Sequence, residues 1–298
     1  MPHSKTVLIT GASRGIGLLA AKALARQGHY VYASMRDVQG RNKERADALR
    51  CWAADNAVML EVVELDVTNE SSTNSAIEKI EEKRPIDALI NNAGVMPTGL
   101  TEAYTVDQVQ QYFDVNMFGI VRSCRAVLPY MRARKSGLIV NLSSAAGRFA
   151  IPYFGVYCAS KWAMEAYCET LHYELEPYGI DSVLIEPSGH GTDLVKTAPA
   201  PEDGDRLTSY GDLTAGRERL LGMFQDMFDK EDVGTDANNV ADRIVELVET
   251  SSARPIRTQV GHDMGVKALN EATAAIQAGL VETLKPVYRG TPLDGGSR

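Results

Sequence analysis

Short apolar runs rich in β-branched residues alternate along the chain with longer segments in which apolar residues recur at helical spacing. The strand-like runs cover residues 6–10, 30–35, 59–67, 87–91, 138–143, 182–186 and 256–260. Helical patterns fill the gaps, notably over residues 106–134 and 157–176 and in the helix that contains Val240, Ile244 and Leu247. Buried strands alternating with helices predict an α/β fold, namely a doubly wound parallel sheet covered on both faces.

Two segments depart from this alternation. Residues 197–212, "TAPAPEDGDRLTSYGD", are rich in Pro, Gly and Asp and have little apolar periodicity, which predicts a mobile loop. We expect residues 192–212 to bound the substrate pocket. Residues 288–298 are predicted to form a flexible tail.

The composition restricts the classes of function. The 298 residues carry a formal net charge of −8, which is unfavourable for binding nucleic acid. The four cysteines form no C-x-x-C pair and are interpreted as free thiols in a reducing compartment, and the histidines show no metal-binding spacing. No apolar run reaches the ~18 residues of a membrane span. A cytoplasmic protein with no metal and no membrane span is therefore expected.

A glycine-rich stretch, "TGASRGIG", follows the first strand and opens a helix. Its spacing is G-x-x-x-G-x-G. Gly11 would form the tight turn, Gly15 would let a phosphate approach the backbone, and Gly17 would let the helix pack against the sheet. Such a turn presents backbone N–H groups to a pyrophosphate. The alternative is an ordinary turn between strand and helix.

A second group of residues suggests proton transfer. Tyr157 and Lys161 are four residues apart on one helical face, and a nearby ammonium lowers the phenol pKa from its usual ~10. Ser144 follows a strand, at the edge where open α/β sheets bind ligands, and its hydroxyl could hold a carbonyl oxygen. The alternatives are a half-buried tyrosine, a solvated lysine and a serine that ends a strand.

Asn116 falls on the apolar stripe of its helix, which is formed by Val109, Phe113, Ile120, Val127 and Met131. A buried amide without partners is costly, so Asn116 should be bonded to something specific. A local hydrogen bond between two helices would suffice.

These motifs, with "NNAG" at residues 91–94 and "YCASK" at residues 157–161, resemble the short-chain dehydrogenase/reductase family over residues 5–260. The resemblance implies a single Rossmann-type domain, here residues 1–298, with a C-terminal helical extension and a nicotinamide cofactor. It implies that Asn116, Ser144, Tyr157 and Lys161 are catalytic, with Asn116 kinking its helix and holding a relay water. The implied cofactor contacts are Gly11, Ser13, Arg14, Gly15, Ile16, Gly17, Arg36, Asp66, Val67, Asn92, Ala93, Gly94, Tyr157, Lys161, Pro187, Gly189 and Thr192.

The choice of nicotinamide depends on the end of the second strand. Arg14 in the glycine-rich turn and Arg36 after the strand favour NADP, because a guanidinium suits a 2′-phosphate. Met35 occupies the place where the family has an acid for NAD. Asp37 would favour NAD if the strand ran two residues longer, so NAD is the less favoured alternative.

The predicted activity is hydride transfer between NADP(H) and a carbonyl or secondary alcohol. Phe149, Ile151, Tyr153 and Phe154, with Met96, suggest a mainly apolar small-molecule pocket, although they could equally serve loop packing.

The family usually has Pro-Gly after the sixth strand, but here Ser188 follows Pro187, so nicotinamide contacts in this loop are open. A weaker resemblance points to the hydroxysteroid and retinol dehydrogenase branch. The alternatives are a non-catalytic NADP(H)-binding sensor and a β-ketoacyl carrier reductase. The family also implies a homodimer or homotetramer formed through the helical segments 106–134 and 157–176.

Overall fold

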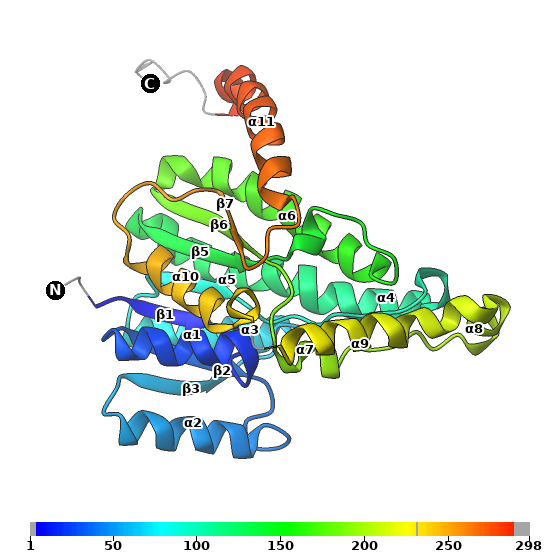
Figure 1. Ribbon diagram of the computed structural model, residues 1–298. Helices are drawn as coiled ribbons and strands as arrows, with labels where there is room; N and C mark the ends of the chain where they lie inside the picture. Colours follow the sequence, from blue (N-terminus) through cyan, green and yellow to red (C-terminus); the bar gives the residue numbers. More distant parts are fainter. Residues whose placement is uncertain (1–3, 231, 289–298) are drawn as a thin grey trace.

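The computed structural model describes residues 4–230 and 232–288. Its seven strands form one parallel sheet in the order β3-β2-β1-β4-β5-β6-β7 (Figure 1). All seven predicted strands are present. They are β1 (Thr6–Ile9), β2 (Tyr30–Met35), β3 (Leu60–Glu64), β4 (Ala88–Asn91), β5 (Gly137–Leu142), β6 (Ile180–Pro187) and β7 (Arg257–Val260).

Helices cover both faces of the sheet, so the predicted doubly wound architecture is confirmed (Figure 1). One apolar core lies between the sheet and α1 (Gly15–Arg26), α2 (Lys43–Asp55) and α10 (Asn238–Glu249). The other lies between the sheet and α3 (Glu70–Lys83), α5 (Gly119–Arg134) and α6 (Gly155–Leu175). Because both faces are buried, the strands are nearly continuous apolar runs.

The helix predicted over residues 106–134 is not continuous. It consists of α4 (Val106–Phe113), a π-helical segment (Asp114–Phe118) and α5. Asn116 lies in the π-helical segment and is 1 % exposed. π-helical turns inside α-helices commonly accompany functional sites. The predicted kink at Asn116 therefore takes the form of a local change in helical pitch.

The loop predicted over residues 197–212 is only partly present, because residues 204–209 and 211–215 are helical. After α7 (Asp193–Lys196), the chain forms α8 (Gly204–Ser209), a 3₁₀ turn (Gly211–Ala215) and α9 (Gly216–Phe228). Asp203 caps α8 by accepting a hydrogen bond from the backbone of Arg206. The backbone oxygen of Pro199 accepts hydrogen bonds from the Thr98 amide and the Tyr104 hydroxyl. These bonds hold the segment before α8 against the rest of the protein.

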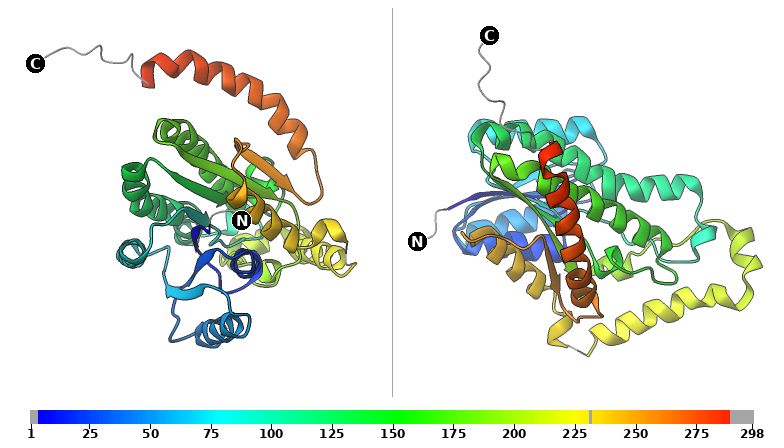
Figure 2. Two further views of the ribbon diagram at one scale, coloured as in Figure 1. Left: turned by 90° about the vertical axis from the view of Figure 1, so that its left-hand side faces the viewer. Right: turned by 90° about the horizontal axis from the view of Figure 1, so that it is seen from above.

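The predicted C-terminal helical extension is α11 (Val266–Tyr288), which follows the edge strand β7. Figure 2 shows it extending over the β6–β7 side of the sheet, on the same side as α6. Tyr288 belongs to this helix, while the rest of the predicted tail, residues 289–298, lies outside the described residues. Within residues 4–230 and 232–288, no helix has the length and apolar character needed to cross a lipid bilayer.

Candidate active site

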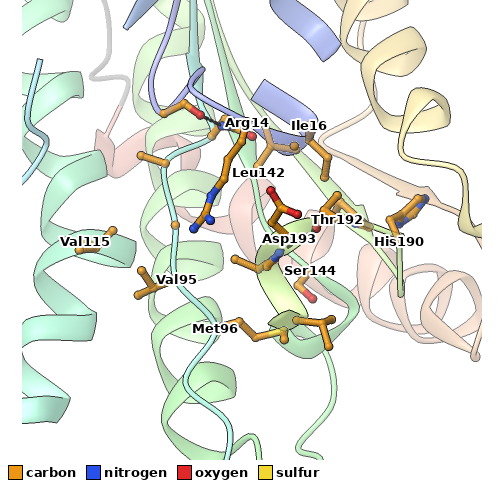
Figure 3. A pocket seen from close by; sticks show the side chains of 18 of the residues that line it. Arg14, Ile16, Val95, Met96, Val115, Leu142, Ser144, His190, Thr192 and Asp193 are labelled. Carbon is orange, nitrogen blue, oxygen red and sulfur yellow. Dashed lines mark hydrogen bonds between the residues drawn. The ribbon is translucent and has the colours of Figure 1, made fainter. Parts of the chain in front are cut away.

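A cavity of about 420 Å³ opens at the carboxyl ends of the strands. It lies beside the junction of β1 and β4, where the strand order reverses, which is the usual ligand site of open α/β sheets. Its walls come from the glycine-rich turn, the ends of β4, β5 and β6, the start of α6, and the helices α7 and α9. In Figure 3, the Arg14 side chain extends from the glycine-rich turn into this cavity, toward the region of Asp193 and Ser144.

The glycine-rich turn fits a pyrophosphate. Gly11 and Gly15 have positive φ angles of 70° and 56°, a conformation that residues with side chains rarely adopt. A Cβ atom on Gly11 would lie 2.8 Å from the Ala93 Cα, and one on Gly17 would lie 2.6 Å from the Gly11 oxygen. The glycines thus allow the turn and the start of α1 to pack closely, and Ser13, Arg14 and Ile16 line the cavity. This arrangement leaves the N-terminus of α1 accessible to an anion.

The "NNAG" segment is hydrogen-bonded to the glycine-rich turn. The Asn92 amide nitrogen donates to the backbone oxygens of Thr10 and Gly11, at 2.9 and 3.0 Å. The Thr10 hydroxyl oxygen accepts from the backbone N–H groups of Asn92 and Ala93, at 3.0 and 3.1 Å. Asn92, Ala93 and Gly94 all line the cavity, as predicted from the sequence. Asn92 therefore sets the position of the turn that would hold the phosphates.

Ser144 and Tyr157 meet at the centre of the cavity. Ser144 begins a 3₁₀ turn (Ala145–Gly147) after β5, and its hydroxyl accepts from the Ala146 amide at 3.1 Å. The Tyr157 side chain is only 6 % exposed, and the neighbouring Ser144 side chain acts to lower its pKa. A substrate oxygen placed in the cavity beside these hydroxyls could receive hydrogen bonds from both.

Lys161 lies one helical turn further along α6 and is buried. Its ammonium donates to the Leu142 backbone oxygen at 2.6 Å and lies 5.8 Å from the centre of the Tyr157 ring. Burial lowers the pKa of Lys161 to about 8. Burial also raises the pKa of Tyr157 to about 12, while the Ser144 hydrogen bond lowers it.

The expectation that Lys161 lowers the phenol pKa is therefore wrong for the protein alone, because loss of solvent around the Tyr157 hydroxyl outweighs other influences. Burial therefore keeps the Tyr157 phenol neutral, so it carries the proton that reduction of a ketone requires.

Asn116 reaches the same region from the π-helical segment. Its amide exchanges two hydrogen bonds with the Val95 backbone, both at 2.9 Å, and donates to the Ser160 hydroxyl at 2.9 Å. A Cβ atom on Gly94 would lie 3.4 Å from the Asn116 oxygen and 4.0 Å from the Lys161 ammonium. The bond to Ser160 is the helix-to-helix hydrogen bond considered from the sequence, and it brings the Asn116 amide close to Lys161.

The loop after β6 differs from the usual pattern at Ser188. The Ser188 amide donates to the Val260 oxygen at 3.0 Å, so this residue continues the pairing with β7. Pro187, Gly189 and Thr192 line the cavity, as predicted. The Thr192 hydroxyl caps α7 by accepting from the Leu194 amide at 3.3 Å. Ser188 itself also lines the cavity, so the loop remains beside the cavity.

The far end of the cavity is basic. Asp66 and Val67, two and three residues beyond β3, line it together with Arg36, Arg41 and Arg45. The strand β2 ends at Met35, so the longer strand that would favour NAD is not formed.

The opposite end is apolar. Ile151, Phe154 and Met96 line the cavity as predicted, but Phe149 and Tyr153 lie elsewhere. The Tyr153 hydroxyl donates to the Leu213 oxygen at 2.9 Å, and the Phe149 ring lies near Gly265. These two residues serve loop packing, as the alternative interpretation held.

Several lining residues were missed by sequence reasoning. They are Leu194, Val195, Phe224, Phe228, Met264 and His190. The two phenylalanines stack with ring centres 6.1 Å apart, and their i,i+4 spacing in "FQDMF" was a usable signal. The His190 ring points away from the cavity centre in Figure 3, and its Nδ1 contacts the Ser188 oxygen at 2.9 Å.

Within the described part of the chain, no group of three or more His, Cys, Asp or Glu side chains is placed to hold a metal ion. A glycine-rich turn at a helix N-terminus, a switch-point cavity and a Ser–Tyr–Lys group together are typical of a nucleotide-dependent oxidoreductase of the α/β class.

Comparison with known proteins agrees with that class. Residues 5–203 match the family model described as short chain dehydrogenase. The chain is 34% identical to a 3-ketodihydrosphingosine reductase from Bacteroides thetaiotaomicron over 86% of this chain and 87% of the relative. It is 41% identical to human 17-beta-hydroxysteroid dehydrogenase type 1, over 66% of this chain and 60% of the relative.

A solved short-chain dehydrogenase from Streptomyces avermitilis is similar throughout. Its TM-score is 0.74 at 28% identity, covering 97% of this chain and 98% of that one. The chain belongs to the short-chain dehydrogenase/reductase family, and it is an oxidoreductase of the kind that binds a nicotinamide cofactor.

Proposed function

We propose that the protein transfers hydride between NADP(H) and the carbonyl or secondary alcohol carbon of a mainly apolar small molecule. The observation that carries this proposal is one cavity lined by the glycine-rich turn, the Ser144–Tyr157–Lys161 group and an apolar end. The nicotinamide supplies the hydride chemistry when bound, and the protein supplies orientation and proton transfer.

We assign the catalytic roles that the family resemblance implies, and the geometry supports them. Ser144 donates a hydrogen bond to the substrate oxygen, and Tyr157, kept neutral by burial, donates the proton when a ketone is reduced. Lys161 binds the nicotinamide ribose through its ammonium. Asn116 holds the Val95 backbone beside Lys161 and maintains the proton relay.

The preference for NADP is supported by the charges at the adenosine end. Arg36, Arg41 and Arg45 line the cavity there. The Arg14 guanidinium donates instead to the Thr197 hydroxyl at 3.1 Å, at the end of α7, so the proposed preference depends on the other three arginines. A 2′-phosphate is the cofactor group that such guanidinium groups would recognise.

The apolar substrate is supported by the side chains between α6 and α9. Phe154 lies 5.9 Å from Phe224, ring edge to face, and Met96 and Ile151 complete an apolar wall. Two of the relatives have names that refer to apolar substrates: a 3-ketodihydrosphingosine reductase and a 17-beta-hydroxysteroid dehydrogenase.

Turnover with defined cofactors tests the proposal. Purified protein is mixed with NADPH or NADH and a panel of aliphatic, steroid and sphingoid ketones, and the loss of nicotinamide absorbance is followed. We expect NADPH consumption with apolar ketones, and a loss of about 10³-fold in kcat for Tyr157→Phe.

The control is Tyr130→Phe, a tyrosine on the surface of α5, which should retain full activity. A protein that binds NADPH but consumes none, with Tyr157→Phe indistinguishable from wild type, would instead be a non-catalytic sensor. Activity confined to β-ketoacyl groups on a carrier protein would identify a carrier reductase.

We also propose that the chain is a cytoplasmic homodimer or homotetramer assembled through α4, α5 and α6. Exposed aromatic side chains on this surface support it, since Phe118 and Trp162 are 50% and 49% exposed. Light scattering of the wild type and Trp162→Glu tests the assembly, because the charge should shift the mass toward monomer.

A further inference from the structure

Five charged side chains from α6, β6, β7 and the turn after Ser144 meet beneath the catalytic lysine. Three are carboxylates, of Glu165 and Glu169 on α6 and Glu186 at the end of β6, and two are the guanidinium groups of Arg148 and Arg257. Glu165 and Glu186 are 3% and 0% exposed. Because water is largely excluded here, each charge depends on its neighbours.

Arg257 occupies the middle of this buried charge cluster. Its Nε lies 2.9 Å from a Glu165 oxygen and 3.5 Å from a Glu186 oxygen. Its terminal nitrogen lies 2.7 Å from a Glu169 oxygen. The edge strand β7 is thereby joined to two successive turns of α6 and to the end of β6, directly before the Pro187 loop.

Glu165 connects the cluster to Lys161. The two residues are four apart on α6, and both are buried. Burial lowers the pKa of Lys161, and the Glu165 charge is the largest influence raising it, followed by Cys168. Burial raises the pKa of Glu165 in turn, and the Arg257 charge is the largest influence lowering it. Arg257, Glu165 and Lys161 thus form a series in which each side chain influences the ionisation of the next.

We propose that Arg257 is a positioning residue that keeps Glu165 ionised and thereby keeps the Lys161 ammonium charged at neutral pH. The groups facing Glu165 are Arg257 from β7, Arg148 from the turn after Ser144, Ser143 at the end of β5, Glu186 from β6, and Lys161 from its own helix. Cys168 on α6 also faces Lys161. The inference rests on the proposed function in one respect, because it assumes that charged Lys161 is the working form.

The cluster also explains why loss of Arg257 should change the protonation of Lys161. Without it, three carboxylates remain with the single guanidinium of Arg148, whose Nε lies 3.8 Å from Glu186. Carboxylates crowded in a dry site take up protons, so Glu165 would become neutral. A neutral Glu165 no longer stabilises the Lys161 ammonium, which would then release its proton at lower pH.

The direct test follows the Lys161 side chain by NMR. Protein labelled with ¹⁵N-lysine is titrated without cofactor, and the Lys161 Nζ signal is assigned with Lys161→Met. Relative to wild type, we expect the midpoint to fall by about one pH unit in Arg257→Gln and in Glu165→Gln. In Arg257→Lys the midpoint should return most of the way to the wild-type value.

The matched control is Arg254→Gln. Arg254 is a similarly buried arginine just before β7, but it pairs with Asp181 and the backbone of α10. Its loss should leave the Lys161 midpoint unchanged. A folded Arg257→Gln protein whose Lys161 midpoint equals that of wild type would overturn the proposal. If Arg257→Gln does not fold, Glu165→Gln and Arg257→Lys decide the question in the same way.

Activity supplies the second measurement. The alkaline fall in kcat/KM for NADPH-dependent reduction should move to lower pH in Arg257→Gln, by the same amount as the NMR midpoint. A wild-type protein that reduces no ketone would contradict the proposed function, while the NMR titration would still decide the role of Arg257. An unchanged pH profile in an active variant contradicts only the positioning role.

Discussion

The Asp37 carboxylate accepts a hydrogen bond from the backbone amide of Arg41 at 2.9 Å. Asp37 has a positive φ of 53°, and it closes a turn that also contains Gly40. The carboxylate is thereby hydrogen-bonded within its own loop, while the neighbouring Arg36 and Arg41 side chains line the cavity. This hydrogen bond holds the carboxylate in its own loop, which agrees with the proposed preference for NADP.

Replacing Arg36 should reduce the preference for NADPH. Arg36→Ala removes one charge-assisted contact to the 2′-phosphate, worth about 1.5–3 kcal/mol, so the KM for NADPH should rise roughly 10–100-fold. The KM for NADH should change less than about threefold, because NADH lacks that phosphate. Steady-state kinetics with both cofactors measure the effect, and Arg50→Ala on the exposed face of α2 is the control. Equal changes for the two cofactors would contradict the NADP assignment.

A methyl group at Gly17 should damage both stability and cofactor binding. The added Cβ would lie 2.4 Å from the Asn92 amide nitrogen and 2.6 Å from the Gly11 oxygen, and the backbone oxygen cannot move away easily. We expect Gly17→Ala to lower the free energy of unfolding by about 1–3 kcal/mol. NADPH binding should weaken with it, because the phosphate turn is displaced.

The control for that change is Gly222→Ala in α9. A Cβ there meets nothing within 4 Å, and alanine is the better helix former, so this variant should gain about 0.5–1 kcal/mol. Denaturant unfolding and NADPH fluorescence titration measure the two effects. A Gly17→Ala protein that is as stable as wild type and binds NADPH equally well would show that the glycine-rich turn can accommodate the added methyl group.

The sequence indicated those parts of the site that local chemistry determines. Buried strands appear as apolar runs, and the glycines are needed where backbones approach closely. The spacing of Phe224 and Phe228 indicates that the two rings can stack, but their place over the cavity could not be predicted, because it depends on where α9 folds back. The raised pKa of Tyr157 was missed for a similar reason, since its burial is created by segments distant in sequence. Residues 204–212 were misassigned because Asp and Pro signal both loops and helix starts.

The aromatic wall on α9 should determine affinity for apolar substrates. Phe224→Ala removes a ring that contacts both Phe154 and Phe228, so the KM for an apolar ketone should rise about tenfold with kcat little changed. The NADPH dissociation constant should stay the same. Met223→Ala is the matched control, because this neighbouring side chain is 57% exposed. A rise in KM for hydrophilic ketones alone would argue against an apolar pocket.

The buried Lys161 should lower the stability of the folded protein. Burial lowers the pKa of Lys161 to about 8, below its value in the unfolded chain, so the folded state binds fewer protons between pH 8 and ~10.4. The wild type should therefore gain stability relative to Lys161→Met as the pH rises through that window. Below pH 8 the full penalty applies, and Lys161→Met should be more stable by about 2 kcal/mol after loss of the Leu142 hydrogen bond.

Urea unfolding at pH 7 and pH 10 measures the difference, and Lys79→Met, on the exposed side of α3, should show no such pH dependence. A Lys161→Met protein that is less stable than wild type at pH 7, with a difference independent of pH, would mean that the cluster around Arg257 compensates the buried charge completely.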